Sequence, residues 1–509
     1  MQNSTQNDHQ TYQNDNFCDK IIALDTTLRD GDQAPGTHLT PDKKLLLATK
    51  LDEAGVNVIE AGNAAVSEGE RQSLKAIANA GLSAQVLSFA RVVPSDIDFA
   101  ASCGVDGVHL VFPASDLHVA EKLRKTKDEA LDLIVDCVSH AKSLGLKVEL
   151  SAEDGSRADP EFLKKVFLAG ANAGAERFCI CDTVGVLSPQ SSYALFFDVK
   201  KALGSRTLAV HCHNDLGLAT ANTLAALAAG AGEFHATVNG IGERTGNAAL
   251  EEVAVGLWHF HSIPTVRLEK LYELSVLSRN LSSFNISSNK PLVGENAFSH
   301  ESGIHVDGLC KNANTYEAIT PSLVGRKRKI LLGKLSGRKA VSLKLEEFGL
   351  GFDDAKKQEA VFLKVKELGD KGKLVTDADL FAICNSLSED FHQKVVLEEL
   401  SASTGNKAGP SASVTLRVYE NGSEVLHSAT GVGDGPVDAA LNAIYSALGA
   451  PDITLSEYHV DAVTGGWDAM ITVRIRMKRG EREIYSGAAG TDIVLTSADA
   501  AIKAINALM

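Results

Sequence analysis

The sequence lacks any apolar run approaching the roughly 18 residues that a membrane-spanning helix needs. Its eight cysteines in 509 residues are too few for a disulfide scaffold, so buried thiols in a reducing cytoplasm are expected. Cationic residues are also in deficit, since 50 Lys and Arg face 65 Asp and Glu, a net charge of −15. These shortages exclude a membrane protein and a small secreted domain, and they disfavour nucleic acid and anionic membranes as partners.

The first residues, 1–19, are rich in Gln and Asn and have neither a basic start nor an apolar run. This composition predicts a disordered tail and not a secretion signal.

Residues 20–285 alternate short β-branched runs with helical periods. The eight candidate strands are IIALDTT, VNVIEAG, SAQVLSF, GVHLVF, KVELSAE, RFCICDT, TLAVHCHN and EFHATVNG. Three of the helices that follow begin at a capping residue and a proline (Thr40-Pro41, Asp159-Pro160, Ser188-Pro189) and end at a glycine (Gly55, Gly174, Gly204). Eight such units predict an α/β fold, the (β/α)8 TIM barrel. A doubly wound open sheet is the alternative, but no glycine-rich dinucleotide loop follows the first strand.

The rest of the chain divides into two parts. Residues 286–408 lose the alternation and carry helical patterns such as DAKKQEAVFLKVKELG, which predicts a linker of small helical subdomains. Residues 409–509 hold a weak internal repeat of the ββα type, with one helix expected at Pro436–Leu448 and the other at Ser497–Leu508. Two such units bury their faces best against each other, which indicates a compact regulatory or dimerising domain.

Polar residues stand where the predicted strands end, and in a TIM barrel catalysis occurs at that end. They include Arg29, Asp30, Glu60, His109, Glu153, Asp182, Thr183, His211, His213 and Asn239. So many charged and imidazole groups at one end of an apolar barrel are costly unless a ligand pairs them.

Two of these residues, His211 and His213, are two apart on a strand, so both rings project from one face. Near Asp30 they favour a divalent metal over buried core histidines. The mixed nitrogen and oxygen donors suit Mn, Zn, Mg or Co. In the loop GIGERTGN after the eighth strand, Asn247 is either a helix cap or a further metal ligand, and both roles are compatible.

The segments LDTTLRDGDQAPG, ELSAED, CDTVGVLSP, HCHNDLG, NGIGERTGN and HESGIHVDG resemble the signature segments of the 2-isopropylmalate, citramalate and homocitrate synthases, which belong to the DRE-TIM metallolyases. The likeness runs from about residue 20 to the C-terminus. EAGNAAVSEGER and HLVFPASDLH are most similar to archaeal-type (R)-citramalate synthases.

The resemblance assigns roles to individual residues. It implies that Asp30, His211, His213 and Asn247 hold the metal, that Arg29 steadies the 2-oxo acid and its developing oxyanion, and that Thr183 binds its carboxylate. It places Glu153 near the acetyl-CoA methyl group, and His305 and Tyr316 in the neighbouring subunit's barrel. Either Glu153 or His305 then removes the methyl proton. The substrate pocket is expected to include His109, Leu110 and Ser151.

The function that the resemblance implies is that of a cytoplasmic, homodimeric acyltransferase of branched-chain amino-acid biosynthesis. It condenses acetyl-CoA with pyruvate to (R)-citramalate, on the route to isoleucine, and an amino acid binds the C-terminal domain as effector. The alternatives are a 2-isopropylmalate synthase, favoured by the small Ser151, a homocitrate synthase with His109 facing the second carboxylate, and a metal-dependent aldolase or lyase.

Overall fold

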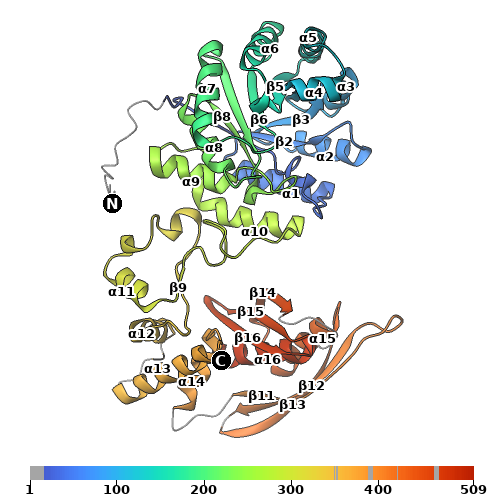
Figure 1. The fold of residues 1–509 in the computed structure, drawn as a ribbon. Helices are drawn as coiled ribbons and strands as arrows, with labels where there is room; N and C mark the ends of the chain where they lie inside the picture. The colour runs from blue at the N-terminus through green and yellow to red at the C-terminus, as the bar shows by residue number, and fades with distance from the viewer. Residues whose placement is uncertain (1–15, 349, 351–353, 388–393, 421, 463–468) are drawn as a thin grey trace. The chain divides into compact units, whose positions relative to one another are not determined.

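The computed structural model describes residues 16–348, 350, 354–387, 394–420, 422–462 and 469–509. It separates into two compact units (Figure 1). One runs to Phe298 and includes Ile319–Arg328, and the other comprises Ser299–Ala318 and Lys329–Met509. No helix among the described residues has the length and apolarity to cross a membrane.

The first unit is built on eight parallel strands that close into a barrel, because β1 pairs with β8 as well as with β2. This confirms the predicted TIM barrel. The strands are β1 Ile22–Asp25, β2 Val58–Asn63, β3 Gln85–Arg91, β4 Gly107–Pro113, β5 Lys147–Glu153, β6 Arg177–Asp182, β7 Thr207–Cys212 and β8 Glu233–Ala236. Nearly all of their residues are buried or partly buried, as expected for a parallel sheet that helices cover on the outside.

Helices cover the outside of this barrel (Figure 1). They are α1 Pro41–Glu53, α2 Glu68–Ala78, α3 Pro94–Ser102, α4 Asp116–His118, α5 Lys127–Ser143, α6 Pro160–Ala173, α7 Pro189–Leu203, α8 Ala219–Ala228, α9 Leu250–His261 and α10 Leu271–Ser282. Ser188 forms a complete capping box at the start of α7, and Gly174 ends α6 in the left-handed conformation, as the sequence predicts.

The tail that is expected to be disordered comprises residues 1–19, and of these residues 1–15 lie outside the described part of the chain. Its last residues contact the barrel. The amide of Asn16 donates to the carbonyl of Ala228, and the ring of Phe17 lies 4.3 Å from that of His261. Phe17 therefore covers apolar surface on the barrel's outside.

The second unit begins with helices around the two-stranded sheet β10-β9 and continues with two three-stranded sheets (Figure 1). Its helices are α11 Gly303–Lys311, α12 Arg338–Glu347, α13 Ala355–Asp370, α14 Asp377–Ser386, α15 Pro436–Leu448 and α16 Ile493–Leu508. Its strands are β9 Ser299–His300, β10 Lys329–Ile330, β11 Val395–Ser403, β12 Ser411–Glu420, β13 Ser423–Val432, β14 Ile453–Ala462, β15 Ile471–Arg479 and β16 Arg482–Gly490.

Each copy of the internal repeat has three strands followed by a helix. The expected ββα unit is therefore one strand short, and in the first copy the strand left out is β11. Strand β11 belongs to the sheet β11-β12-β13, and the C-terminal repeat therefore starts at Val395 and not at 409. Both copies carry a register shift at the same place, Leu397/Glu399 in β11 and Leu455/Glu457 in β14. Helices α15 and α16 pack on their own sheets and against each other, so the two copies share one core.

Candidate active site

A cavity of about 540 Å³ opens at the carboxyl ends of the barrel strands. Its lining combines charged and imidazole side chains with a smaller apolar part: Arg29, Asp30, Gln33, Phe89, Arg91, Val92, Val93, His109, Val111, Pro113, Lys122, Leu123, Glu153, Cys181, Thr183, His211, His213, Glu243 and Arg244. Most of the polar residues that the sequence places at the strand ends therefore meet in one cavity.

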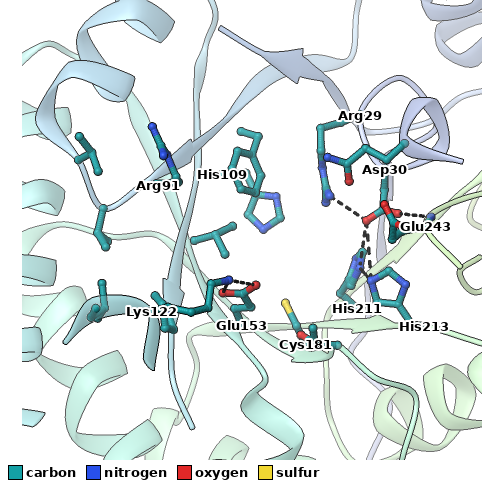
Figure 2. Close-up of a pocket in the computed structure, with 18 of the residues that line it drawn as sticks. Arg29, Asp30, Arg91, His109, Lys122, Glu153, Cys181, His211, His213 and Glu243 are labelled. Atoms are coloured by element: carbon teal, nitrogen blue, oxygen red, sulfur yellow. Dashed lines mark hydrogen bonds and ion pairs between the residues drawn. The ribbon is translucent and has the colours of Figure 1, made fainter. Parts of the chain in front are cut away.

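Asp30, His211 and His213 place their ligand atoms close enough together to hold a metal ion, on one side of the cavity (Figure 2). We call these three residues the metal cluster. The Nε2 atoms of the two histidines lie 3.3 Å apart, and they lie 3.7 and 3.9 Å from Oδ2 of Asp30. Metal–ligand bonds of about 2.1 Å place tetrahedral ligand atoms ~3.4 Å apart, so these three spacings suit a shared cation.

The electrostatics of the metal cluster favour the forms that bind metal. Burial lowers the pKa of His211 well below its usual range, and the neighbouring His213 lowers it further. Burial also lowers the pKa of His213. For Asp30 burial acts in the opposite direction, but opposing effects, of which the charge of Arg29 is the largest, hold the pKa below its ordinary value. The cluster is thus a carboxylate with two neutral imidazoles, as metal coordination requires.

Asn247 lies beside the metal cluster because its loop approaches the end of β7. There the backbones of Asn247 and His213, the residue that follows β7, form a β-bridge. Its amide nitrogen donates to Oδ1 of Asp30 at 2.9 Å. Its buried Oδ1 has no hydrogen-bond partner among the described residues. A β-carbon on Gly242 would lie 2.2 Å from that amide nitrogen, so glycine is required there. The unpartnered oxygen fits a further donor to a cation.

Arg29 is fixed at the floor of the cavity by carboxylates on both sides. Its Nη1 donates to Asp30 at 2.7 Å and its Nε to Glu60 at 2.8 Å, while its guanidinium lies over the ring of Phe89. Glu60 is fully buried, and burial raises its pKa, but Arg29 and His109 outweigh this effect and hold the pKa well below the usual range. A permanent positive charge therefore stands next to the metal cluster.

His109 has partners on both ring nitrogens. Nδ1 bonds to Glu60 at 2.7 Å, and Nε2 makes a short hydrogen bond with the hydroxyl of Ser151. Ser151 is itself fully buried and lies outside the cavity lining, although it supports the ring that lines it. Neither nitrogen of His109 is left to bind a second carboxylate of a substrate.

Glu153 and Thr183 line the cavity next to each other in the barrel, at the ends of β5 and β6. The Thr183 hydroxyl accepts a hydrogen bond from the amide of Asp154 at 2.8 Å, which leaves its own proton to donate. Both oxygens of Glu153 lie 2.6 Å from Nζ of Lys122, across the cavity from the metal cluster (Figure 2).

Leu110 does not line the cavity, contrary to expectation. Alternate residues of a strand point to opposite faces, so His109, Val111 and Pro113 face the cavity while Leu110 and Phe112 pack between barrel and helices.

His305 and Tyr316 lie in the second unit, where their rings stack 4.1 Å apart. They are absent from the lining of the cavity in the first unit.

Sequence reasoning missed a second group of buried polar residues inside the barrel. His109, Glu149 and His235 form this interior cluster, with Nε2 of His235 2.7 Å from Glu149. Arg177 lies 3.1 Å from Glu149 and 3.3 Å from Glu233. Charged residues in a strand usually indicate the face that contacts solvent. Only the spacing of Glu149, Ser151 and Glu153, which places all three on the same face of the strand, could have predicted this group.

Comparisons with known proteins agree with this architecture. The HMGL-like family matches residues 20–277, the homocitrate synthase post-HMGL domain-like family matches 292–373, and the LeuA allosteric (dimerisation) domain matches 374–509. The fold and the cluster thus define a TIM-barrel enzyme with an appended LeuA-type allosteric domain.

The chain is similar to curated proteins over almost its whole length. A putative (R)-citramalate synthase of Methanothermobacter thermautotrophicus is 51% identical over 96% of this chain and 98% of the relative. The (R)-citramalate synthase of Methanocaldococcus jannaschii is 49% identical over 96% and 99%, and the 2-isopropylmalate synthase of that organism 45% identical over 98% and 96%. The chain belongs to the citramalate and 2-isopropylmalate synthase family of acyltransferases.

Proposed function

We propose that the enzyme condenses acetyl-CoA with pyruvate to give (R)-citramalate and CoA, a step toward isoleucine. The observation that carries this proposal is the metal cluster beside Arg29, at the floor of a cavity with Glu153 on its other side. Relatives of nearly full length named (R)-citramalate synthase support the choice of substrate.

The charges of the floor suit an anionic 2-oxo acid. Arg29, Asp30 and Glu60 together carry a net charge of −1, and a divalent cation changes this sum to +1. A carboxylate of charge −1 then neutralises the site, as a buried cluster requires. We assign that carboxylate to Thr183, whose hydroxyl proton is free to donate.

The metal would be held by Asp30, His211 and His213, with Asn247 as a further donor, and Mn, Zn, Mg and Co are the candidates. When bound it supplies Lewis-acid polarisation of the ketone. Arg29 directs its guanidinium toward the oxygen that gains negative charge, and a preorganised donor of this kind is worth about 10²–10³ in rate. Glu153 or His305 accepts the proton of the acetyl-CoA methyl group.

The second candidate is 2-isopropylmalate synthase, because a relative of that name is 45% identical over 98% of this chain. The small Ser151 adds no volume for a branched side chain, since it is bonded to His109 outside the cavity lining. Homocitrate synthesis is disfavoured, since Glu60 and Ser151 occupy both nitrogens of His109. An aldolase or lyase has no need of the allosteric domain matched at 374–509.

We further propose a homodimer in which His305 and Tyr316 act at the neighbouring subunit's cavity, with an amino acid, isoleucine for this substrate, as effector of the LeuA-type domain. The eight cysteines are free thiols, which suits a reducing compartment, and the proposed location is the cytoplasm.

The deciding experiment follows release of free CoA thiol with pyruvate, 3-methyl-2-oxobutanoate and 2-oxoglutarate in parallel. We expect kcat/KM for pyruvate to exceed that for 3-methyl-2-oxobutanoate by about tenfold or more, since one methylene in a pocket changes selectivity about 10–200-fold. A preference for the branched acid would establish the second candidate. Thiol release with none of the three would refute both.

A further inference from the structure

We propose that Lys122 is a catalytic residue for acetyl-CoA, holding the Glu153 carboxylate before proton transfer and donating to the thioester oxygen after it. The inference rests on the proposed function and takes Glu153 as the proton acceptor. Lys122 and Glu153 both line the cavity, on the side away from the metal cluster (Figure 2).

The contact between the two side chains is symmetric and close. A single ammonium lies 2.6 Å from each oxygen of Glu153. The carboxylate side chain is 24% exposed and that of Lys122 is 51% exposed. An ion pair this open adds little to stability. The pair therefore has small value for the fold, and its place in the cavity favours a role in the reaction.

The backbone around Lys122 is irregular in a way that directs it at the cavity. Val119–Leu123 form a π-helical turn after α4, and Arg124 follows in the left-handed conformation at φ 54°. Such turns are concentrated at functional sites. Lys122 lies inside this turn. Because a regular α-helix would point its side chain at a different angle, the turn sets the direction of Lys122.

The segment that carries Lys122 is also tied to the end of β5. The amide of Ala114 donates to the carbonyl of Glu153 at 2.9 Å, and the Ser115 hydroxyl donates to the buried carboxylate of Asp154. His118 lies 3.6 Å from Glu153 on the same side. The start of the segment that carries Lys122 is therefore anchored at the end of β5, where Glu153 stands.

The chemistry of a thioester enolate needs a cation at this place. In the step, a methyl C–H bond breaks and its proton goes to a Glu153 oxygen. The electron pair forms a C=C bond, and the thioester C=O pair moves onto oxygen. The negative charge thus passes from Glu153 to an oxygen two bonds from the methyl carbon. Lys122, already touching Glu153, donates an N–H to that oxygen and stays paired with the charge. The enolate C=C pair then forms the bond to the ketone carbon of the 2-oxo acid, the thioester C=O re-forms, and the ketone π pair moves onto its oxygen, next to Arg29.

The other cations of the cavity wall are engaged elsewhere. Arg91 is paired with Asp96, and Arg244 with Asp215. Arg29 is held between Asp30 and Glu60 on the metal side. Among the described residues that line the cavity, Lys122 is therefore the cation placed at Glu153.

The test compares Lys122→Met with Lys125→Met, an exposed lysine of the same segment that does not line the cavity. We expect Lys122→Met to lower kcat about 100-fold with KM for the 2-oxo acid unchanged, and Lys122→Arg to recover at least tenfold of the loss. The deuterium isotope effect on kcat with methyl-deuterated acetyl-CoA should rise in Lys122→Met, because proton transfer becomes slower. Its unfolding midpoint should stay within about 2 °C of wild type.

Two results would overturn the inference while the wild type remains active. One is a kcat of Lys122→Met within threefold of the Lys125→Met control. The other is a fall in kcat without a rise in the isotope effect, which would show a structural role. A wild type that releases no thiol from acetyl-CoA with any 2-oxo acid would instead refute the proposed function.

Discussion

The barrel contains two clusters of histidine with carboxylate, and they differ in what surrounds them. The metal cluster, Asp30 with His211 and His213, faces the cavity. The interior cluster, His109 with Glu149 and His235, is connected to it through the rings of His211 and His235, 5.5 Å apart, but Glu149 and His235 do not line the cavity.

The charge of the second carboxyl group separates the two clusters. In the interior cluster Arg177 pairs with Glu149, while burial and the adjacent Glu149 raise the pKa of Glu233 well above its usual range. In the metal cluster Arg29 is shared between Asp30 and Glu60, and the pKa values of both carboxyl groups are held low. Burial lowers the pKa of His235 as well as that of His211, so the histidines do not distinguish the clusters. Grouped ligand atoms thus do not define a metal site by themselves. The unbalanced negative charge and access to the cavity decide between the two.

The largest expected effect comes from removing a ligand of the metal cluster. His211→Ala should lower turnover at least 1,000-fold and lose bound metal, measured by elemental analysis after dialysis, because one of the two imidazole donors is removed. The matched control is His235→Gln in the interior cluster, which should keep its metal. Loss of metal from the control and retention in His211→Ala would reverse the assignment of the clusters.

Removal of Arg177, the cation of the interior cluster, should instead lower the free energy of unfolding of the barrel. Arg177→Met leaves Glu149 and Glu233 buried without their cation and should cost about 3–5 kcal/mol of unfolding free energy in urea. The metal content of the folded variant should equal that of wild type. A variant of unchanged stability that loses its metal would show that the interior cluster serves the metal site.

The smallest effect is expected where the interior cluster meets the substrate pocket. Ser151→Ala removes the hydroxyl bonded to His109 and should cost about 0.5–1.5 kcal/mol in stability. The freed ring should change the ratio of kcat/KM for pyruvate and 3-methyl-2-oxobutanoate by less than tenfold. A larger change would mean that Ser151 itself contacts the 2-oxo acid.

Much of the barrel follows from local patterns. The strand ends and the capping residues before proline are properties of short segments, and they predicted the eight strands and the meeting of Asp30 with His211 and His213. The prediction that Leu110 lines the cavity is wrong because Leu110 is next to His109 in the strand, and neighbouring strand residues point to opposite faces.

Other features depend on contacts distant in sequence or on irregular backbone. Strand β11 was missed because most of its side chains are exposed and its pattern is interrupted at Leu397/Glu399. The pairing of Lys122 with Glu153 bridges 31 positions and depends on a π-helical turn, which has no periodic signature in the sequence. The Arg177 contacts depend on barrel closure, because Glu149 and Glu233 come from different strands.

The loop after β8 has a consequence for how this enzyme could be diversified. A β-carbon on Gly242 would collide with Asn247, and one on Gly246 would lie 1.9 Å from the carbonyl of Gly240. Library members that replace Gly242 or Gly246 would therefore be lost, whereas Val111 lines the cavity wall and is not part of the metal cluster. New substrate scope should therefore be sought in the wall, with the glycine loop kept as inherited.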